Sequence, residues 1–578
     1  MYKVTWKTRI RKNPWFGLFG ILAIYGLLLF PTIGRQGISW DEQTDIWVAR
    51  AYLKQPDGWL AGSDIDPSQT RLPAFTVALV YTLLNNSGLI LARAVSGITG
   101  VLTLVAVFIF CKQRFDTRRG LMACALLATS PFYLSFARVA FTETDIYLAC
   151  TLAWLLVYLD RLQGRPSIRR AAFVGVFAGL AISAKFTAIS VLPAIWYAVW
   201  QTRNRSQGMG LHRESLYKII FWISWEFVFL LGGWYFANTI SPEKYQGSLR
   251  LVHYLVIFSG WLLTLVWALR RPQFTSSWYL FGLLITGLAM LTFLVLPPEH
   301  LTNTSILHNL TGRFEHEMTY RVGFMLEAAA LHIFSIFFKS SLVIGAALLV
   351  TSILATFQWR NWKIQFPLLV IWLYFGCLSV LPLAQTFYTI PILPIMAIFT
   401  ADQFFSVVSR KRIFAFGLAA LAGLSLAVDM VLCYPDYNLN GYQWLGNRIL
   451  AGRPSIGYRS IVQTPSDGVE QVVDWLNDHA ETGEIVRAYL LPWHIVQARA
   501  PNPAYQLENG LQDRVTAEPD YIVVEINTQV RQSWWIRSSP VDVFRPLYNT
   551  AWLEANYNKV FTVRRAFGIE MASVYRKK

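Results

Sequence analysis

Long apolar runs separated by short basic segments fill the first 433 residues of the chain. Runs approaching 20 apolar residues predict membrane-spanning helices. The predicted spans are 15–33, 93–111, 120–136, 146–160, 171–184, 187–200, 217–236, 251–269, 277–296, 340–358, 364–383, 387–405 and 413–433. The first run follows five cations and has no small-residue cleavage site after it, so we expect an uncleaved span. The pattern predicts an all-α polytopic membrane domain over 1–433, with about 13 transmembrane helices.

Lysine and arginine between spans collect on the cytoplasmic side of membrane proteins, so basic clusters indicate the topology. The clusters lie at 112–119, 161–170, 203–218, 270–271, 360–363 and 410–412. With the N-terminus inside as well, alternation places 34–73 and 297–327 in outer loops. Segment 74–91 is apolar enough to cross, but crossing would place the cluster at 112–119 outside. We therefore predict a juxtamembrane or re-entrant segment at the outer surface.

The last 145 residues, 434–578, are too polar to span a membrane. Val469, Val472, Val473 and Leu476 follow helical spacing, and β-rich runs lie at 484–491, 521–527 and 569–575. The alternation of spans places this segment on the outer side. It is therefore predicted to be an extracytoplasmic α/β domain.

Composition agrees with the membrane prediction. Hydrophobic residues make up 54% of the chain and charged residues 15%, with a mean hydropathy of +0.38. These values exclude disorder, collagen-like repeats and a coiled coil. The net charge of +17 is largely explained by the basic loops, so we expect no nucleic-acid partner. The five cysteines have no C-x-x-C spacing, which argues against a zinc cluster or a disulfide framework.

Two acidic turns are candidates for catalysis. Asp41 and Glu42 follow the first span, where a partly desolvated carboxylate can act as a general base. Glu143 and Asp145 lie in a second turn on the same predicted face and could orient an acceptor or a divalent cation such as Mg or Mn. The alternatives are solvated loop acids, a helix cap at Asp145, or ion pairs with Arg138.

Cations on the outer face could hold a phosphate. Lys185 lies at a predicted hairpin tip between two short apolar runs, and Arg71 and Arg138 lie in outer segments. Ionisable residues at membrane depth are costly and tend to line cavities. The alternatives are a snorkelling lysine and arginines that balance the acidic loops.

The loop 297–327 contains Glu315, His316, Glu317 and Arg321. These residues lack the H-E-x-x-H spacing, so substrate contact from an outer loop is favoured over metal binding. A solvated loop remains the alternative.

In order along the chain, several segments resemble the GT-C glycosyltransferases that use polyprenyl-phosphate sugars, particularly the protein O-mannosyltransferase and lipid A aminoarabinose transferase group. They are Trp40-Asp41-Glu42, Arg71-Leu-Pro, the run from Ala92-Arg93, the run from Leu127 to Arg138, the run from Gly179 to Lys185, and Tyr388 to Pro394. Phe186 and Gln385 depart from the family pattern. Trp534-Trp535-Ile536 lacks the aspartate of the oligosaccharyltransferase W-W-D signature.

The resemblance implies sugar transfer from a polyprenyl phosphate to a hydroxyl acceptor on lipid, glycan or protein at the outer face. Asp41 would be the base of an inverting reaction, Lys185, Arg71 or Arg138 would bind the donor phosphate, and Tyr388 would join the substrate-contacting residues. We expect a prokaryotic plasma-membrane location. The alternatives are a lipid-linked sugar flippase or transporter, and a non-catalytic glycan-binding scaffold.

Overall fold

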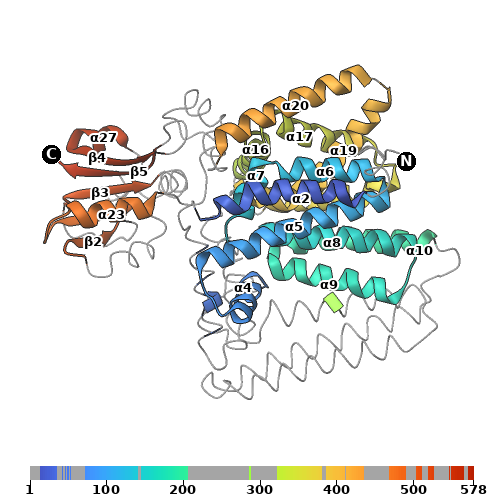
Figure 1. Ribbon diagram of the computed structural model, residues 1–578, viewed down its shortest axis with the longest axis horizontal. Helices are drawn as coiled ribbons and strands as arrows, with labels where there is room; N and C mark the ends of the chain where they lie inside the picture. Colours follow the sequence, from blue (N-terminus) through green and yellow to red (C-terminus); the bar gives the residue numbers. More distant parts are fainter. Residues whose placement is uncertain are drawn as a thin grey trace, which may run out of the picture.

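The computed structural model is mostly helical, with a small sheet near the C-terminus (Figure 1). It describes residues 14–34, 42, 46, 48–50, 53, 72–140, 145–205, 286–287, 322–380, 386–410, 412–434, 468–489, 503–510, 518–525, 546, 549–564 and 570–578. The helical part consists of α2 (Trp15–Leu29), η1 (Phe30–Thr32), α4 (Leu72–Leu84), α5 (Leu89–Arg114), α6 (Thr117–Ala128), α7 (Pro131–Ala137), α8 (Asp145–Gly164), α9 (Ile168–Ala184), η2 (Phe186–Val191), α10 (Leu192–Arg205), α16 (Val322–Lys339), α17 (Leu342–Phe357), α18 (Trp362–Val380), η3 (Thr386–Ile392), α19 (Leu393–Arg410) and α20 (Arg412–Cys433).

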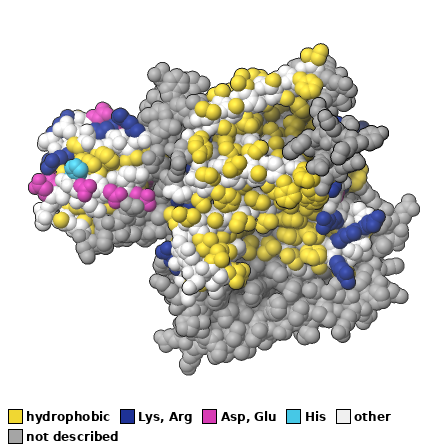
Figure 2. Space-filling model, in the orientation of Figure 1, with side chains coloured by type: hydrophobic (Ala, Val, Ile, Leu, Met, Phe, Trp, Pro, Cys, Tyr) yellow, Lys and Arg dark blue, Asp and Glu magenta, His cyan; other side chains and the backbone are white. Residues whose placement is uncertain are grey.

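Within the described residues, four helical segments are long and apolar enough to cross a membrane. They are Trp15–Thr32, Leu89–Arg114, Trp362–Ser379 and Phe387–Val407, and α6 with α7 adds a fifth if this pair, bent by 67°, is one span. Figure 2 shows a broad hydrophobic surface over the helices, with few charged side chains. The chain is therefore an integral membrane protein; the count of 13 spans stays a prediction.

Most predicted spans outside 217–296 coincide with helices of the structure, but α16 was not predicted. It begins inside the expected outer loop 297–327 and continues through 328–339, to which no element was assigned. Glu327 and Lys339 limit its charge-free apolar run to 11 residues, which is too short to signal a span. Segment 74–91 contains α4, whose 13 residues reach about 20 Å, short of a bilayer core.

Helix α5 lies at the centre of the bundle and packs against α2, α6 and α8. Its small residues permit close approach of α2: a Cβ on Gly100 would lie 2.0 Å from the Tyr25 hydroxyl, and one on Gly97 would lie 2.7 Å from Leu29. The Tyr25 hydroxyl donates to the Gly97 carbonyl at 3.3 Å. Small residues at such interfaces allow the backbone contact that stabilises helix pairs in lipid.

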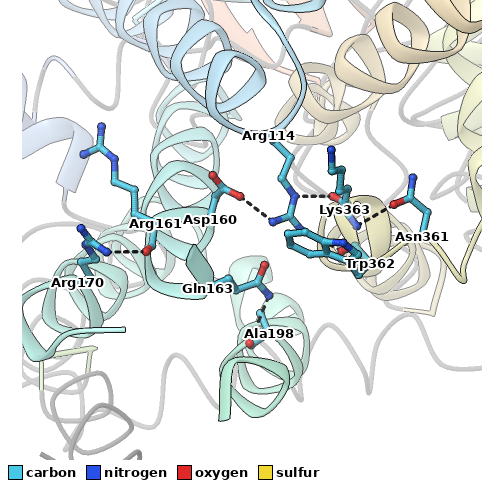
Figure 3. A network of polar contacts seen from close by, with 9 residues as sticks. All are labelled: Arg114, Asp160, Arg161, Gln163, Arg170, Ala198, Asn361, Trp362 and Lys363. Carbon is cyan, nitrogen blue, oxygen red and sulfur yellow. Dashed lines mark hydrogen bonds and ion pairs between the residues drawn. The ribbon is translucent and has the colours of Figure 1, made fainter. Parts of the chain in front are cut away.

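Arg114, the last residue of α5, joins three helices at one end of the bundle (Figure 3). Its guanidinium donates to Asp160 of α8 at 2.7 Å and to the carbonyls of Trp362 and Lys363 at the start of α18, at 2.9 and 3.0 Å. It also lies 3.9 Å from the centroid of the Trp362 ring. We call this the basic end of the bundle, because the basic clusters 112–119, 161–170 and 360–363 lie there.

The C-terminal region contains a five-stranded mixed sheet in the order β2-β1-β3-β5-β4. Its strands are β1 (Ile485–Tyr489), β2 (Gln506–Asn509), β3 (Tyr521–Glu525), β4 (Tyr557–Arg564) and β5 (Glu570–Lys577), with helices α23 (Val469–His479) and α27 (Thr550–Asn556). β1 runs parallel to β2 and β3, and β5 is antiparallel to β3 and β4. The apolar face of α23 covers the sheet, as its spacing predicts. Strands β2 and β4 were not predicted. β2 has four residues and no β-branched or aromatic residue, and the β-rich run of β4 is only four residues long, 560–563.

Inside the sheet, polar side chains are paired. Arg487 of β1 donates to Glu508 of the neighbouring β2 at 2.8 Å. Burial raises the pKa of the Tyr489 hydroxyl to about 12, so this group stays protonated at neutral pH.

In Figure 1 the sheet lies beyond the end of the bundle where α4 and the start of α5 are found. That end is opposite the basic end and is called the site end below.

Candidate active site

Lys185 lies in a buried polar cluster at the site end. It directly follows α9, where the backbone becomes extended (φ −161°, ψ 131°) before η2. Its Nζ atom is 2.9 Å from Oδ1 of Asp145, the first residue of α8. The two side chains are 11% and 3% exposed. The pair forms because α8 and α9 are packed neighbours, which brings the start of one helix beside the end of the other.

Aromatic rings enclose this ion pair. Nζ of Lys185 lies 3.7 Å from the centroid of the Tyr388 ring and 5.7 Å from that of Phe387, both in η3. Phe387 in turn packs against Phe136 of α7, with centroids 5.5 Å apart. Such surroundings exclude water and strengthen electrostatic interactions. A buried ammonium group with one carboxylate and an aromatic wall can bind an anion such as a phosphate.

A second buried ion pair joins Glu42 and Arg93, and both side chains are 0% exposed. Nε and Nη2 of Arg93 each donate to one carboxylate oxygen of Glu42 at 2.7 Å. The Ala140 backbone N–H donates to the same carboxylate at 2.8 Å, and Arg93 also donates to the Ile33 carbonyl at 2.6 Å. Three donors therefore hold Glu42, which fixes the residue next to Asp41 against α5 and against the turn after α7.

Four regions far apart in the sequence meet at the site end. Asp145, Lys185 and Tyr388 form the contacts above, and Glu42 is bound to Ala140, five residues before Asp145. Arg138 ends α7 and is 1% exposed. The remaining predicted site residues lie outside the described part of the chain: Asp41, Arg71, Glu143, Glu315, His316, Glu317 and Arg321.

The structure adds contacts that the sequence did not predict at two of the candidate residues. Asp145 was expected to orient an acceptor or a metal ion together with Glu143, but its carboxylate binds Lys185. Glu42 was expected to act with Asp41 in catalysis, but its carboxylate is occupied by Arg93 and Ala140. Arg93 itself was not singled out, although a lone arginine inside the apolar run 93–111 was a signal that a buried partner exists.

A divalent cation was expected from Glu143 and Asp145, and Asp145 is the one of this pair that the structure describes. Within the described residues, no group of three or more His, Cys, Asp or Glu side chains lies close enough together to hold one. Asp145 is the described member of the predicted metal-orienting pair, and an ammonium group already lies on its Oδ1 atom. The divalent cation stays a prediction that depends on Glu143.

A protein-family comparison agrees with the class of protein that the sequence resembles. Residues 68–225 match the family described as dolichyl-phosphate-mannose-protein mannosyltransferase. The matched segment contains Arg93, Arg138, Asp145 and Lys185, and it ends before Tyr388. The predicted resemblance to polyprenyl-phosphate-dependent GT-C glycosyltransferases is confirmed by this match.

Among solved structures, the oligosaccharyltransferase of Archaeoglobus fulgidus in complex with Zn and sulfate is 14% identical, with a TM-score of 0.47; 97% of this chain and 73% of that chain are covered. The same organism's AglB with an inhibitory peptide and a dolichol-phosphate is 12% identical (TM-score 0.45; 99% and 75% covered). ArnT from Cupriavidus metallidurans bound to undecaprenyl phosphate is 11% identical (TM-score 0.29; 97% of both chains). No curated protein matches the chain at the significance applied.

Proposed function

We propose that this protein is a membrane glycosyltransferase that moves a sugar from a polyprenyl phosphate to a hydroxyl acceptor at the outer face of the membrane. The observation that carries the proposal is the buried Lys185–Asp145–Tyr388 cluster, whose first two members lie in the family-matched segment. A desolvated cation at the end of a helical bundle suits a lipid-linked phosphate, whose chain can remain in the bilayer.

The reaction is a single displacement. The acceptor oxygen attacks the anomeric carbon, and the bond between that carbon and the phosphate oxygen breaks. The polyprenyl phosphate leaves with the bonding electron pair, and Asp41 accepts the hydroxyl proton. An alcohol is a weak nucleophile until a base removes its proton, so this carboxylate determines the rate. Attack opposite to the leaving group inverts the anomeric configuration.

Lys185 stabilises the negative charge that develops on the leaving phosphate. A cation in a water-excluded site stabilises a negatively charged transition state far more than a cation in solvent does. Asp145 keeps the ammonium group in place before the donor binds, and the Tyr388 ring supports its charge. Arg71 and Arg138 are proposed as further phosphate ligands.

Glu42 positions the base rather than acting as one. Its carboxylate accepts hydrogen bonds from Arg93 and Ala140, so it orients Asp41 through the chain. The outer loop residues Glu315, His316, Glu317 and Arg321, together with Glu143, are proposed to contact the acceptor.

The test is to incubate the purified protein with a panel of polyprenyl-phosphate sugars and hydroxyl acceptors. We expect one donor to be consumed, with inverted product configuration by NMR, and we expect Asp41→Asn to lose transfer by at least about 100-fold. Asp57→Asn, which changes another acid of the first outer loop, is the matched control. Retention of configuration, or full turnover by Asp41→Asn, would contradict the mechanism. Movement of the donor across the membrane without transfer would favour a flippase.

A further inference from the structure

Four arginines lie in and beside the turn between α8 and α9, at the basic end, and none is ion-paired with a described acid. Arg161 is in the last turn of α8, Arg165 is in the turn itself, and Arg169 and Arg170 are in the first turn of α9. Asp160, the acid nearest in sequence, is instead paired with Arg114. No ion pair joins the four arginines to a carboxylate of the described residues. The turn therefore carries uncompensated positive charge.

Two of these arginines are used within the fold, and two are exposed. Arg170 donates to the carbonyls of Arg161 (3.1 Å) and Arg165, closing the end of α8. The Arg161 guanidinium lies 5.2 Å from the centroid of the Tyr158 ring, and Figure 3 shows it pointing away from Asp160. Arg165 and Arg169 are exposed, so their guanidinium groups are available to an anion from outside.

An aromatic surface begins directly beside this charge. Tyr158 of α8 stacks on Phe173 and Phe177 of α9, with centroids 4.8 and 5.2 Å apart, and Trp154 stacks on Phe177 at 6.0 Å. The spacing of four residues in each helix places the rings on one face. We call these four residues the aromatic ladder. Phe173, three residues after Arg170, is 47% exposed.

Among the described residues, Gly287 approaches α9 on a different face from the one that carries Phe173. Gly287 approaches α9 at Gly175, two residues from Phe173 and therefore about 200° around the helix. Figure 2 shows basic side chains bordering the hydrophobic surface at the end of the bundle where α9 begins. The arginines, the exposed Phe173 ring and the half-buried rings behind it thus lie in the order of a lipid headgroup and its acyl chains.

We propose that this face is a binding site for one anionic phospholipid. Its phosphate lies between Arg165 and Arg169, and its acyl chains lie along the aromatic ladder. Guanidinium groups bind phosphate oxygens in pairs, and basic sites between helices on the cytoplasmic side suit anionic headgroups. A zwitterionic lipid carries an ammonium group that the unpaired arginines repel. The site is separate from the Lys185 cluster and does not depend on the proposed transfer reaction.

Native mass spectrometry of the full chain in nanodiscs tests this proposal, with equal amounts of phosphatidylglycerol and phosphatidylcholine. We expect one phosphatidylglycerol to stay bound preferentially. Arg165→Gln with Arg169→Gln is expected to weaken its retention roughly 30-fold, since each cation near the membrane surface contributes about 1 kcal/mol of attraction to anionic lipid. Phe173→Ala is expected to reduce retention without changing the headgroup preference.

Arg118→Gln with Arg360→Gln is the matched control, because both arginines are exposed at the same end and neither contacts a described aromatic ring. This control pair should retain the lipid as the wild type does. Equal losses in the two double variants would mean a general effect of charge and would overturn the site. Equal retention of both lipids by the wild type would overturn it too. Gel filtration and melting curves establish that each variant is folded.

Discussion

Arg93 and Lys185 are buried cations that each hold a carboxylate at the site end. Their partners come from residues 51 and 40 positions away in the chain. A buried charge is tolerated only with a partner and hydrogen bonds, so each pair ties two segments together. The pairs differ in use: Arg93 is fully enclosed, whereas Lys185 keeps some exposure beside aromatic rings.

The Glu42–Arg93 pair allows a test of positioning. Glu42→Gln leaves the buried Arg93 guanidinium without a countercharge, so we expect a loss of roughly 3 kcal/mol in the free energy of unfolding, together with lower activity. Glu42→Gln combined with Arg93→Met should restore part of the stability, because no unpaired charge remains. Thermal melting in detergent measures both. An unchanged melting temperature for Glu42→Gln would show that the Glu42–Arg93 ion pair does not hold the segment around Glu42 in place.

Lys185 is expected to act on the donor. Lys185→Gln with Asp145→Asn removes both charges together and avoids leaving one buried carboxylate unpaired. We expect the donor KM of this double variant to rise about tenfold or more, as a charged hydrogen bond to phosphate is lost. Asp145→Asn alone leaves the buried Lys185 ammonium without its carboxylate, so we expect lower stability in the absence of donor. A bound donor phosphate supplies the missing countercharge, so the donor KM should rise less than in the double variant. If that single change weakens donor binding as much as the double change, Lys185 is not the phosphate ligand.

At the scale of elements, α5 connects the two ends of the bundle. Its first half supplies Arg93 to the site end, and its last residue, Arg114, binds α8 and α18 at the basic end. Helix packing in lipid gains little from the hydrophobic effect, so polar contacts of this kind and close small-residue contacts fix the arrangement.

Arg114→Gln is expected to destabilise the helix arrangement without touching the chemistry. The change removes the ion pair with Asp160 and weakens the contacts to the start of α18, at a cost of about 3 kcal/mol. Activity per folded molecule should stay near that of the wild type, and thermal inactivation should be faster. Arg118→Gln, on the exposed surface nearby, should change neither. A large loss of donor turnover with unchanged stability would contradict this interpretation.

At the scale of the whole molecule, the sheet lies beyond the site end (Figure 1), and the basic clusters 112–119, 161–170 and 360–363 lie at the opposite end. Positive charge favours the cytoplasmic side, which predicts that the sheet is on the outside. Residues at the site end and residues at the basic end are therefore expected to be accessible from opposite sides of the membrane.

Cysteine labelling measures this topology. In a background without native cysteines, Glu481→Cys beside α23 should react with a membrane-impermeant maleimide in intact cells, whereas Arg118→Cys should react only after permeabilisation. Both positions are exposed, so the comparison depends on the side of the membrane. Labelling of Arg118→Cys in intact cells would reverse the predicted orientation.

Local pattern explains why most helices were predictable and why α16 and strand β4 were not. Runs such as 93–111 carry a strong periodic or apolar signal within one segment. In α16, Glu327 and Lys339 interrupt the run, and in β4 exposed residues alternate irregularly with buried ones. Glu42 was predicted as a functional residue, but its role depends on Arg93, and no pattern within either segment relates them.

By itself the sequence determined that the chain is an integral membrane protein, where most of its helices lie, and that Asp145 and Lys185 are unusual charged positions beside apolar runs. Tyr388 was a candidate only through the family resemblance. Only the tertiary structure decided that the side chains of Asp145, Lys185 and Tyr388 meet. It also decided that Arg93 is ion-paired with Glu42 and that α16 forms a helix within the bundle. The physical reason is that the hydrophobic pattern of a segment reflects which of its faces contact lipid or the protein core. Partner choice between buried charges depends on how helices far apart in the chain pack together.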